Sequence, residues 1–189
     1  EREYMCSLLT AAKHFLDTLG FKGIRVSTRP DCIDDEVLSV LKSYGVTAIE
    51  LGAQSMDDQV LVSNRRGHSA EDVRRASALI KSYGFELGLQ MMTGLFKSDS
   101  QKDLYTAKEI IKLMPDTVRI YPTVVLKNTH LSYLQEKGEY IALTAEESAP
   151  FCAELLQMFE KSGIKVIKLG LHSSEAVEND MVGGAYHPA

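Results

Sequence analysis

The chain has 189 residues, of which 44% are hydrophobic, and this length suits one well-buried domain better than two. Its formal net charge of -5 argues against a nucleic-acid-binding protein that relies on a broad basic surface. No apolar run approaches the roughly 20 residues that cross a bilayer, and no signal peptide opens the sequence, so we expect a cytoplasmic protein. Because no initiator methionine precedes Glu1, we expect a fragment of a longer protein.

Helices and strands alternate along the first half of the chain. Apolar residues recur every three or four positions from Tyr4 to Leu19, which is typical of an amphipathic helix. Short apolar runs bounded by glycine, proline and capping residues are typical of strands. The predicted helices here cover residues 4–19, 35–44, 56–62 and 69–83. The predicted strands cover residues 24–28, 47–51 and 85–91.

The second half continues the alternation and then loses it. The predicted elements are helices at 100–113, 131–136 and 144–161 and strands at 118–121 and 164–169. The connection from Pro122 to Leu143 is long enough to carry function or to cover a site. Residues 171–189 are polar and are expected to be irregular. We therefore place residues 1–170 in one domain and residues 171–189 in a C-terminal extension.

This order predicts an α/β fold with parallel strands joined by right-handed crossovers. A doubly wound sheet and part of a (β/α) barrel fit the pattern equally well. The strands end in polar residues, and carboxyl ends of parallel strands meet at one edge of a sheet, so we expect a shared binding mouth. Its candidate residues are Ser27, Arg29, Asp31, Glu50, Gln54, Arg66, His68, Gln90 and Tyr121.

The residue types at this mouth favour binding over several familiar chemistries. The chain has no glycine-rich phosphate-binding motif, no Gly-x-Ser-x-Gly and no His-Glu-x-x-His. Gln54 and Gln90 are uncharged side chains that suit hydrogen bonding to a heterocycle or a ribose. Arg66 can hold a carboxylate with two hydrogen bonds. His68 has two interpretations, a general base or a cap of the following helix.

Five blocks, in this order, resemble those of radical SAM enzymes: residues 27–31 (STRPD), 50–55 (ELGAQS), 66–68 (RGH), 91–95 (MMTGL) and 120–123 (IYPT). The nearest branch is similar to the catalytic subunit of Elongator, and oxygen-independent coproporphyrinogen oxidase is a more distant relative. The resemblance implies a partial TIM-type (β/α) barrel, truncated at its N-terminal side, that binds S-adenosylmethionine and a [4Fe-4S] cluster. Such an oxidoreductase-like enzyme forms a 5′-deoxyadenosyl radical.

The resemblance also implies roles and partners. It implies that cofactor binding involves Gln54, Arg66, Ser27, Gln90 and Tyr121. The substrate is then a tRNA base, by the likeness to Elongator, or a porphyrin precursor, by the likeness to the oxidase. No membrane partner is implied.

The cysteines depart from the family pattern. The family binds its cluster with Cys-x-x-x-Cys-x-x-Cys, whereas Cys6, Cys32 and Cys152 lie far apart, so we expect free thiols and no metal ligands. We therefore expect a piece that lacks the first two βα units, is inactive alone and forms a homodimer through an exposed sheet edge.

Two other functions stay open. The first is a non-catalytic α/β small-molecule-binding domain that has lost the cluster. The second is an ordinary barrel enzyme that uses Glu50 and His68 in acid–base chemistry, although Glu50 also suits an ion pair with Arg25 or Arg29 on a neighbouring strand.

Overall fold

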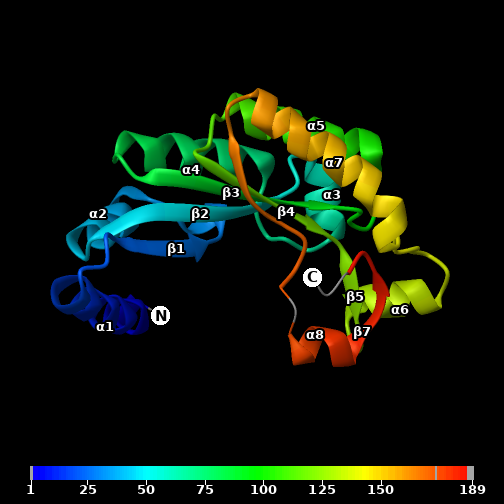
Figure 1. Cartoon of the computed structure of the whole chain (residues 1–189), viewed down its shortest axis with the longest axis horizontal. Coiled ribbons are helices and arrows are strands. Elements are labelled where there is room, and N and C mark those ends of the chain that lie inside the picture. Colours follow the sequence, from blue (N-terminus) through cyan, green and yellow to red (C-terminus); the bar gives the residue numbers. More distant parts are fainter. Residues whose placement is uncertain (1, 173, 187–189) are drawn as a thin grey trace.

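A parallel sheet with the strand order β1-β2-β3-β4-β6 forms the centre of the molecule (Figure 1). The computed structural model describes residues 2–172 and 174–186. The α/β class and the parallel pairing are confirmed, and within the described residues the sheet is open, because β1 and β6 lie at its two edges. The strands are β1 (Ile24–Thr28), β2 (Val46–Gln54), β3 (Glu86–Thr93), β4 (Thr117–Pro122) and β6 (Lys165–Leu169).

The helices α2, α4, α5 and α7 pack against the strands of this sheet. Figure 1 shows α4, α5 and α7 above the sheet in this view, α1 below the edge strand β1, and α8 beside β7 (Met181–Gly184). No helix among residues 2–172 and 174–186 combines the length and the apolar character needed to span a membrane. The helices are α1 (Arg2–Leu19), the 3-10 helix η1 (Pro30–Cys32), α2 (Asp35–Ser43), α3 (Asp58–Ser63), α4 (Ala70–Ser82), α5 (Ser100–Lys112), α6 (His130–Glu136), α7 (Ala145–Lys161) and α8 (Glu175–Asp180).

Polar side chains fix where the helices begin. Ser69 begins α4 and Thr144 begins α7, each in a capping box with the acidic residue three positions further on. Asp34 caps α2 by accepting a hydrogen bond from the Val37 amide. These helices therefore begin close to the predicted positions.

The core lies between the central strands and the helices that cover them. Ile49 and Leu51 of β2 and Leu87 and Leu89 of β3 are completely buried. Burying each such side chain contributes about 1.5–3 kcal/mol to folding. The two central strands are consequently held firmly at the point where their carboxyl ends leave the sheet.

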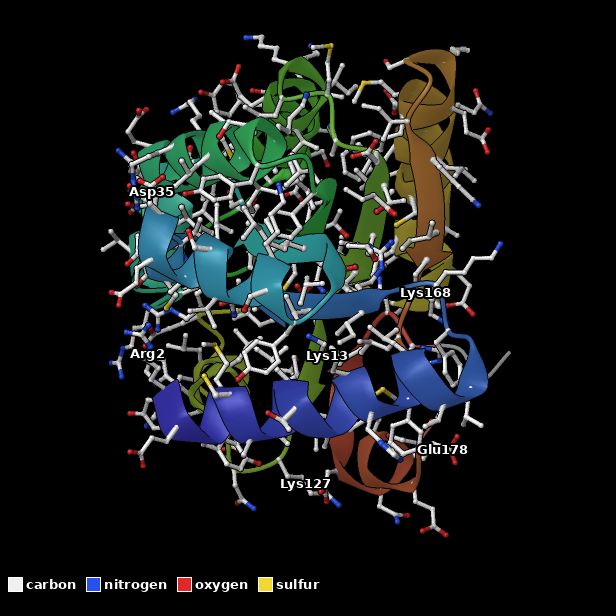
Figure 2. The ribbon with its side chains drawn as sticks, turned by 90° about the vertical axis from the view of Figure 1, so that its left-hand side faces the viewer. Arg2, Lys13, Asp35, Lys127, Lys168 and Glu178 are labelled. Carbon is white, nitrogen blue, oxygen red and sulfur yellow. The ribbon has the colours of Figure 1, made fainter. Side chains whose placement is uncertain are left out.

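Helix α1 packs beside α2 but keeps much of its apolar surface exposed. Figure 2 shows Lys13 on the side of α1 that faces α2, where its Nζ donates to the Ser43 carbonyl oxygen at 3.1 Å. Leu9 is buried, whereas Tyr4 and Leu19 are 70% and 65% exposed. The predicted helix is confirmed, although its apolar residues do not form one buried stripe.

The prediction that residues 171–189 are irregular is wrong for part of this segment. Residues Glu175–Asp180 form α8, and Met181–Gly184 form β7, which pairs antiparallel with β5 (Val124–Leu126). The sequence hides β7 because Gly183 and Gly184 provide no side chains with strand propensity. Residue 173 and residues 187–189 lie outside the described residues, and the predicted domain division stays a prediction.

Candidate functional site

A cavity of about 440 Å³ lies at the carboxyl ends of β1, β2 and β3, and we call it the Arg66 cavity. It brings together four of the five side chains predicted to bind a cofactor, namely those of Ser27, Gln54, Arg66 and Gln90. Parallel pairing explains this convergence, since Gly52 lies opposite Gln90 in the register of β2 and β3. The full lining is Ser27, Thr28, Arg29, Gly52, Gln54, Arg65, Arg66, His68 and Gln90.

Tyr121, the fifth predicted residue, lies outside this lining. Its hydroxyl accepts a hydrogen bond at 3.2 Å from Nη1 of Arg119, which precedes it by two residues on β4. Residues that the sequence did not single out, above all Gly52 and Arg65, line the cavity instead. Their signal was weak, because glycines occur in strands and arginines occur on surfaces in many places that bind no ligand.

Gln54 has a strained backbone that directs its side chain into the cavity. Its φ angle is 63°, a conformation that non-glycine residues rarely adopt, and the β2–β3 register shifts between Gly52 and Gln54. The residue is only 7% exposed. A Cβ atom on Gly52 would lie 2.7 Å from Gln54 Nε2, so the glycine leaves room for the amide. Strain of this kind is concentrated at functional sites.

Arg66 is a half-buried cation without a counter-ion among the described residues. Burial lowers the pKa of its guanidinium, and the positive charge of nearby Arg29 lowers it further. The lining of the cavity contains no acidic residue. Arg29 differs, because its guanidinium donates two hydrogen bonds to the Asp31 carboxylate, at 2.9 and 2.6 Å. Arg66 therefore suits an anion that enters from outside.

The loop that carries Arg66 is held at three points, by the end of β2 and by residues that follow β1 and β3. His68 Nε2 donates to the Ala53 carbonyl oxygen at 3.1 Å, and Arg29 Nη2 donates to that of Gly67 at 3.2 Å. Asn64 Nδ2 donates to the Phe96 carbonyl oxygen at 2.8 Å. His68 thus contacts the end of β2, a third role besides the two predicted ones, and it leaves Nδ1 without a hydrogen-bond partner in the described part of the chain.

Glu50 lies beneath the cavity and is completely buried. Its Oε2 is 3.0 Å from Arg119 Nε and 3.8 Å from Arg25 Nη1, and its Oε1 accepts a hydrogen bond from Gln90 Nε2. The predicted ion pair with Arg25 is confirmed. Because a buried and paired carboxylate has no access to a substrate, this geometry does not support acid–base catalysis by Glu50.

A second cavity, of about 480 Å³, lies between the end of β3 and the start of α7, and we call it the Asp103 cavity. Asp103 accepts hydrogen bonds from the Gly94 amide at 2.8 Å and the Ser98 hydroxyl at 2.6 Å. Burial raises the pKa of Asp103 to about 6. Tyr140 donates to the Gly94 carbonyl oxygen at 2.6 Å, and burial raises its pKa to about 12. The long connection from Pro122 to Leu143 thus covers this cavity through Tyr140.

The cysteines do not come together. Cys6 lies in α1, the exposed Cys32 in η1 and the buried Cys152 in α7, and all three are free thiols. Among residues 2–172 and 174–186, no three histidine, cysteine or acidic side chains are arranged to hold a metal ion.

Comparison with known proteins gives the chain its family. A model described as "Radical SAM superfamily" matches residues 3–107, more than half of the chain, and a "Radical_SAM C-terminal domain" model matches residues 115–189. Among curated proteins, the tRNA uridine(34) acetyltransferase of Methanocaldococcus infernus is 37% identical over 127 residues, covering 65% of this chain and 24% of the relative. Elongator complex protein 3 of Homo sapiens is 30% identical over 139 residues, covering 72% of this chain and 25% of the relative.

Solved structures agree with this assignment. Elp3 of the archaeon Methanocaldococcus infernus, with an N-terminal deletion, has a TM-score of 0.79 and 27% identity, covering 88% of this chain and 39% of that one. Coproporphyrinogen III oxidase (HemN) from Escherichia coli shares the fold with a TM-score of 0.58 and 19% identity, over 75% of this chain and 32% of that one. The chain spans about a quarter of the length of the two curated relatives. By its sequence, its open parallel sheet and its likeness to these proteins, the chain belongs to the radical SAM superfamily.

Proposed function

We propose that the Arg66 cavity binds S-adenosylmethionine and that the chain is part of a radical SAM enzyme. The observation that carries this proposal is Arg66 itself, a half-buried guanidinium in a cavity lined by no acidic residue. The carboxylate of the methionyl group is an anion that it can bind with two hydrogen bonds. Gln54, Ser27 and Gln90 provide uncharged polar groups for the ribose and the adenine.

The size of the cavity supports this ligand. Its volume of about 440 Å³ falls within the roughly 300–1,000 Å³ that is usual for small-molecule sites. The Asp103 cavity is larger but is a poor site for a carboxylate, because acidic residues predominate among the charged residues of its lining: Lys97, Asp99, Asp103, Glu139 and Glu147. We therefore place the cofactor in the smaller cavity.

The described residues do not suit the [4Fe-4S] cluster that the family implies. When bound, it supplies the electron for reductive cleavage of S-adenosylmethionine, and it needs cysteine thiolates that converge. The thiols of this chain lie on α1, η1 and α7 and do not fit that requirement. We derive no catalytic step from the described residues, and the reaction remains a proposal for the whole protein.

The substrate we propose is a tRNA base. The curated relatives support it through their names, since one is a tRNA uridine(34) acetyltransferase. The likeness to coproporphyrinogen III oxidase, at 19% identity, shows the fold alone and gives a porphyrin precursor less support. The homodimer through the sheet edge and the cytoplasmic location stay predictions, and the exposed apolar side chains of α1 support the first.

One observation favours a second function, a non-catalytic small-molecule-binding domain. The same cavity binds the ligand in either case, but the separated cysteines give residues 2–172 and 174–186 no cluster site. Anaerobic incubation with iron and sulfide, followed by gel filtration and iron analysis, distinguishes the two for the chain itself. A stable cluster with the spectrum of a [4Fe-4S] protein would exclude the second function.

The first test of the proposal is direct binding. Titration of the 189-residue chain with S-adenosylmethionine in a calorimeter should give one site per chain. Amide resonances of residues that line the Arg66 cavity should shift in NMR spectra, while those around Asp103 should not. A chain that gives no heat and no shifts, although it is folded, would overturn the proposed function.

The substitution Gly52→Ala tests the position of the ligand. The new Cβ would come within 2.7 Å of Gln54 Nε2, at the end of a flexible side chain, so the amide should move and the fold should not. We expect the affinity for S-adenosylmethionine to fall about 3- to 10-fold, with the free energy of unfolding changed by less than about 1 kcal/mol.

The control for this substitution is Gly84→Ala, at a turn where a Cβ meets nothing within 4 Å. The φ angle of Gly84 is 78°, so this variant should lose stability through backbone strain and keep its affinity. Equal affinity of Gly52→Ala and the wild type would place the ligand away from Gln54.

A further inference from the structure

The buried carboxylate of Glu50 has one partner that reaches the Arg66 cavity. Its Oε1 accepts the hydrogen bond from Gln90 Nε2, and Gln90 lines the cavity. Glu50 itself does not belong to the lining and is completely buried. Among the described residues, Glu50 therefore contacts the lining of the cavity through Gln90.

The chemistry of this pair fixes the orientation of the Gln90 amide. A carboxylate offers only acceptors, so the NH₂ group of Gln90 must face Glu50. The amide oxygen is then left without a hydrogen-bond partner among the described residues. Glu50 consequently fixes which end of the Gln90 amide is its oxygen, an acceptor that an unpaired glutamine could equally well turn the other way.

Charged neighbours on two strands keep the Glu50 carboxylate in place. Arg119 Nε lies 3.0 Å from Oε2 as an ion pair, and neither atom has an aligned hydrogen bond within the described part of the chain. Arg119 is in turn held by the Tyr121 hydroxyl, at 3.2 Å. A Cβ on Gly88 would come within 3.1 Å of Glu50 Cγ, so this glycine gives the side chain its space. The position of Glu50 on β2 is therefore set by Arg25 of β1, by Gly88 of β3 and by Arg119 of β4.

From this geometry we propose that Glu50 is a positioning residue that fixes the Gln90 amide so that its oxygen is presented as an acceptor in the Arg66 cavity. An acceptor at this point selects a ligand group that donates, and on a nucleoside the ribose hydroxyls are such groups. The inference rests on the proposed binding of S-adenosylmethionine and adds how the cavity recognises the sugar. It also gives Tyr121 an indirect part in the site, through Arg119.

The test is a double-mutant cycle on binding of S-adenosylhomocysteine, measured by calorimetry. Glu50→Gln permits both orientations of the Gln90 amide, and we expect about a 10-fold loss of affinity. In a Gln90→Leu background the same change should add less than about a twofold loss, because the group that Glu50 positions is gone. Losses that multiply would show that Glu50 acts independently of Gln90 and would overturn the inference.

A matched control removes a neighbouring charge without touching Gln90. Glu86 forms an ion pair with Arg25 on the same side of the sheet and lies outside the cavity. Glu86→Gln should leave the affinity within about twofold of the wild type. If Glu86→Gln weakens binding as much as Glu50→Gln, charge alone accounts for the effect and the inference fails.

A spectroscopic measurement keeps the inference testable if Glu50→Gln folds poorly. The side-chain NH₂ resonances of Gln90, assigned by their loss in Gln90→Leu, should show slowed hydrogen exchange in the wild type without ligand. Rapid exchange, as in an exposed glutamine, would overturn the positioning role. Slowed exchange in a wild-type chain that binds no adenosyl ligand would instead reject the proposed function and leave the positioning role standing.

A second ligand completes the test. The wild type should bind an S-adenosylhomocysteine analogue without its ribose hydroxyls about 10-fold more weakly than the parent compound, and Glu50→Gln should lose most of this discrimination. Equal binding of both compounds by the wild type would exclude the ribose as the group that Gln90 recognises.

Discussion

Replacing Arg66 with alanine should weaken the binding of S-adenosylmethionine about 10- to 100-fold, or about 1.4 to 2.8 kcal/mol, since hydrogen bonds to charged groups fall in this range. Arg66 is half-buried, has no counter-ion among the described residues and lies near the positive charge of Arg29. A carboxylate that enters the cavity relieves this unfavourable situation. The alanine variant removes that gain, and calorimetric titration measures the loss.

The control for Arg66 is a ligand instead of a second residue. 5′-Methylthioadenosine has the adenosyl part of S-adenosylmethionine without its carboxylate, so Arg66→Ala should leave its affinity within about twofold. Arg66→Lys keeps the charge but loses the planar fork, and we expect an intermediate affinity. If Arg66→Ala weakens both ligands equally, the arginine supports the loop and does not bind the carboxylate.

Replacing Asp103 with asparagine should stabilise the chain near neutral pH. The folded state raises the pKa of this carboxyl from 3.8 to about 6, mainly through burial. The folded chain thus holds the proton more tightly than the unfolded chain. The stability that this gives is fully present below the pKa of the unfolded state and is lost as the pH rises through the pKa of the folded state. Above about pH 6, a pKa difference of this size lowers the free energy of unfolding by about 3 kcal/mol relative to its value at low pH.

The side-chain amide of the Asp103→Asn variant does not titrate, so the variant does not lose stability in this way as the pH rises. Its amide oxygen can still accept from the Gly94 amide, as the carboxylate of Asp103 does at 2.8 Å. Denaturant unfolding should show the advantage of Asp103→Asn growing by about 2 kcal/mol between about pH 4.5 and about pH 7.5. Glu154→Gln, at an exposed position on α7, should show no comparable trend. An advantage that stays flat or shrinks with pH would contradict the proposed titration.

Local sequence signals accounted for most of the elements in the sheet and its helices. Apolar periodicity and capping residues such as Ser69 and Thr144 specify where a helix forms and where it begins. The strand order could not be derived in this way, because it depends on pairings between residues far apart in the chain. A doubly wound sheet and a partial barrel therefore looked alike until the pairing of β1 with β2 and of β4 with β6 was known.

The weakest part of the prediction was the C-terminal segment. Strand β7 contains two glycines and is recognisable only through its partner β5, which itself has three residues. At Gly184 a Cβ would lie 2.5 Å from the Thr123 carbonyl oxygen, so the close approach of the two strands requires a glycine. The need for a glycine at this position can be recognised only when the position of the neighbouring backbone is known.

The site was predictable where it depended on strand ends. Ser27, Gln54 and Gln90 were placed together because carboxyl ends of parallel strands converge, and Arg66 followed from the loop after β2. Tyr121 was placed by the same rule, yet its hydroxyl contacts Arg119 and not the cavity. The rule gives the end of the sheet at which a residue lies but does not give the direction of its side chain.

The order of strands along the sheet follows the order of β1, β2, β3 and β4 in the sequence. Each βα unit therefore contributes its own wall to the Arg66 cavity: Ser27 comes from the first, Gln54 and Arg66 from the second and Gln90 from the third. Substitutions in one unit can therefore change the ligand preference, while the buried strands that support all three units stay the same.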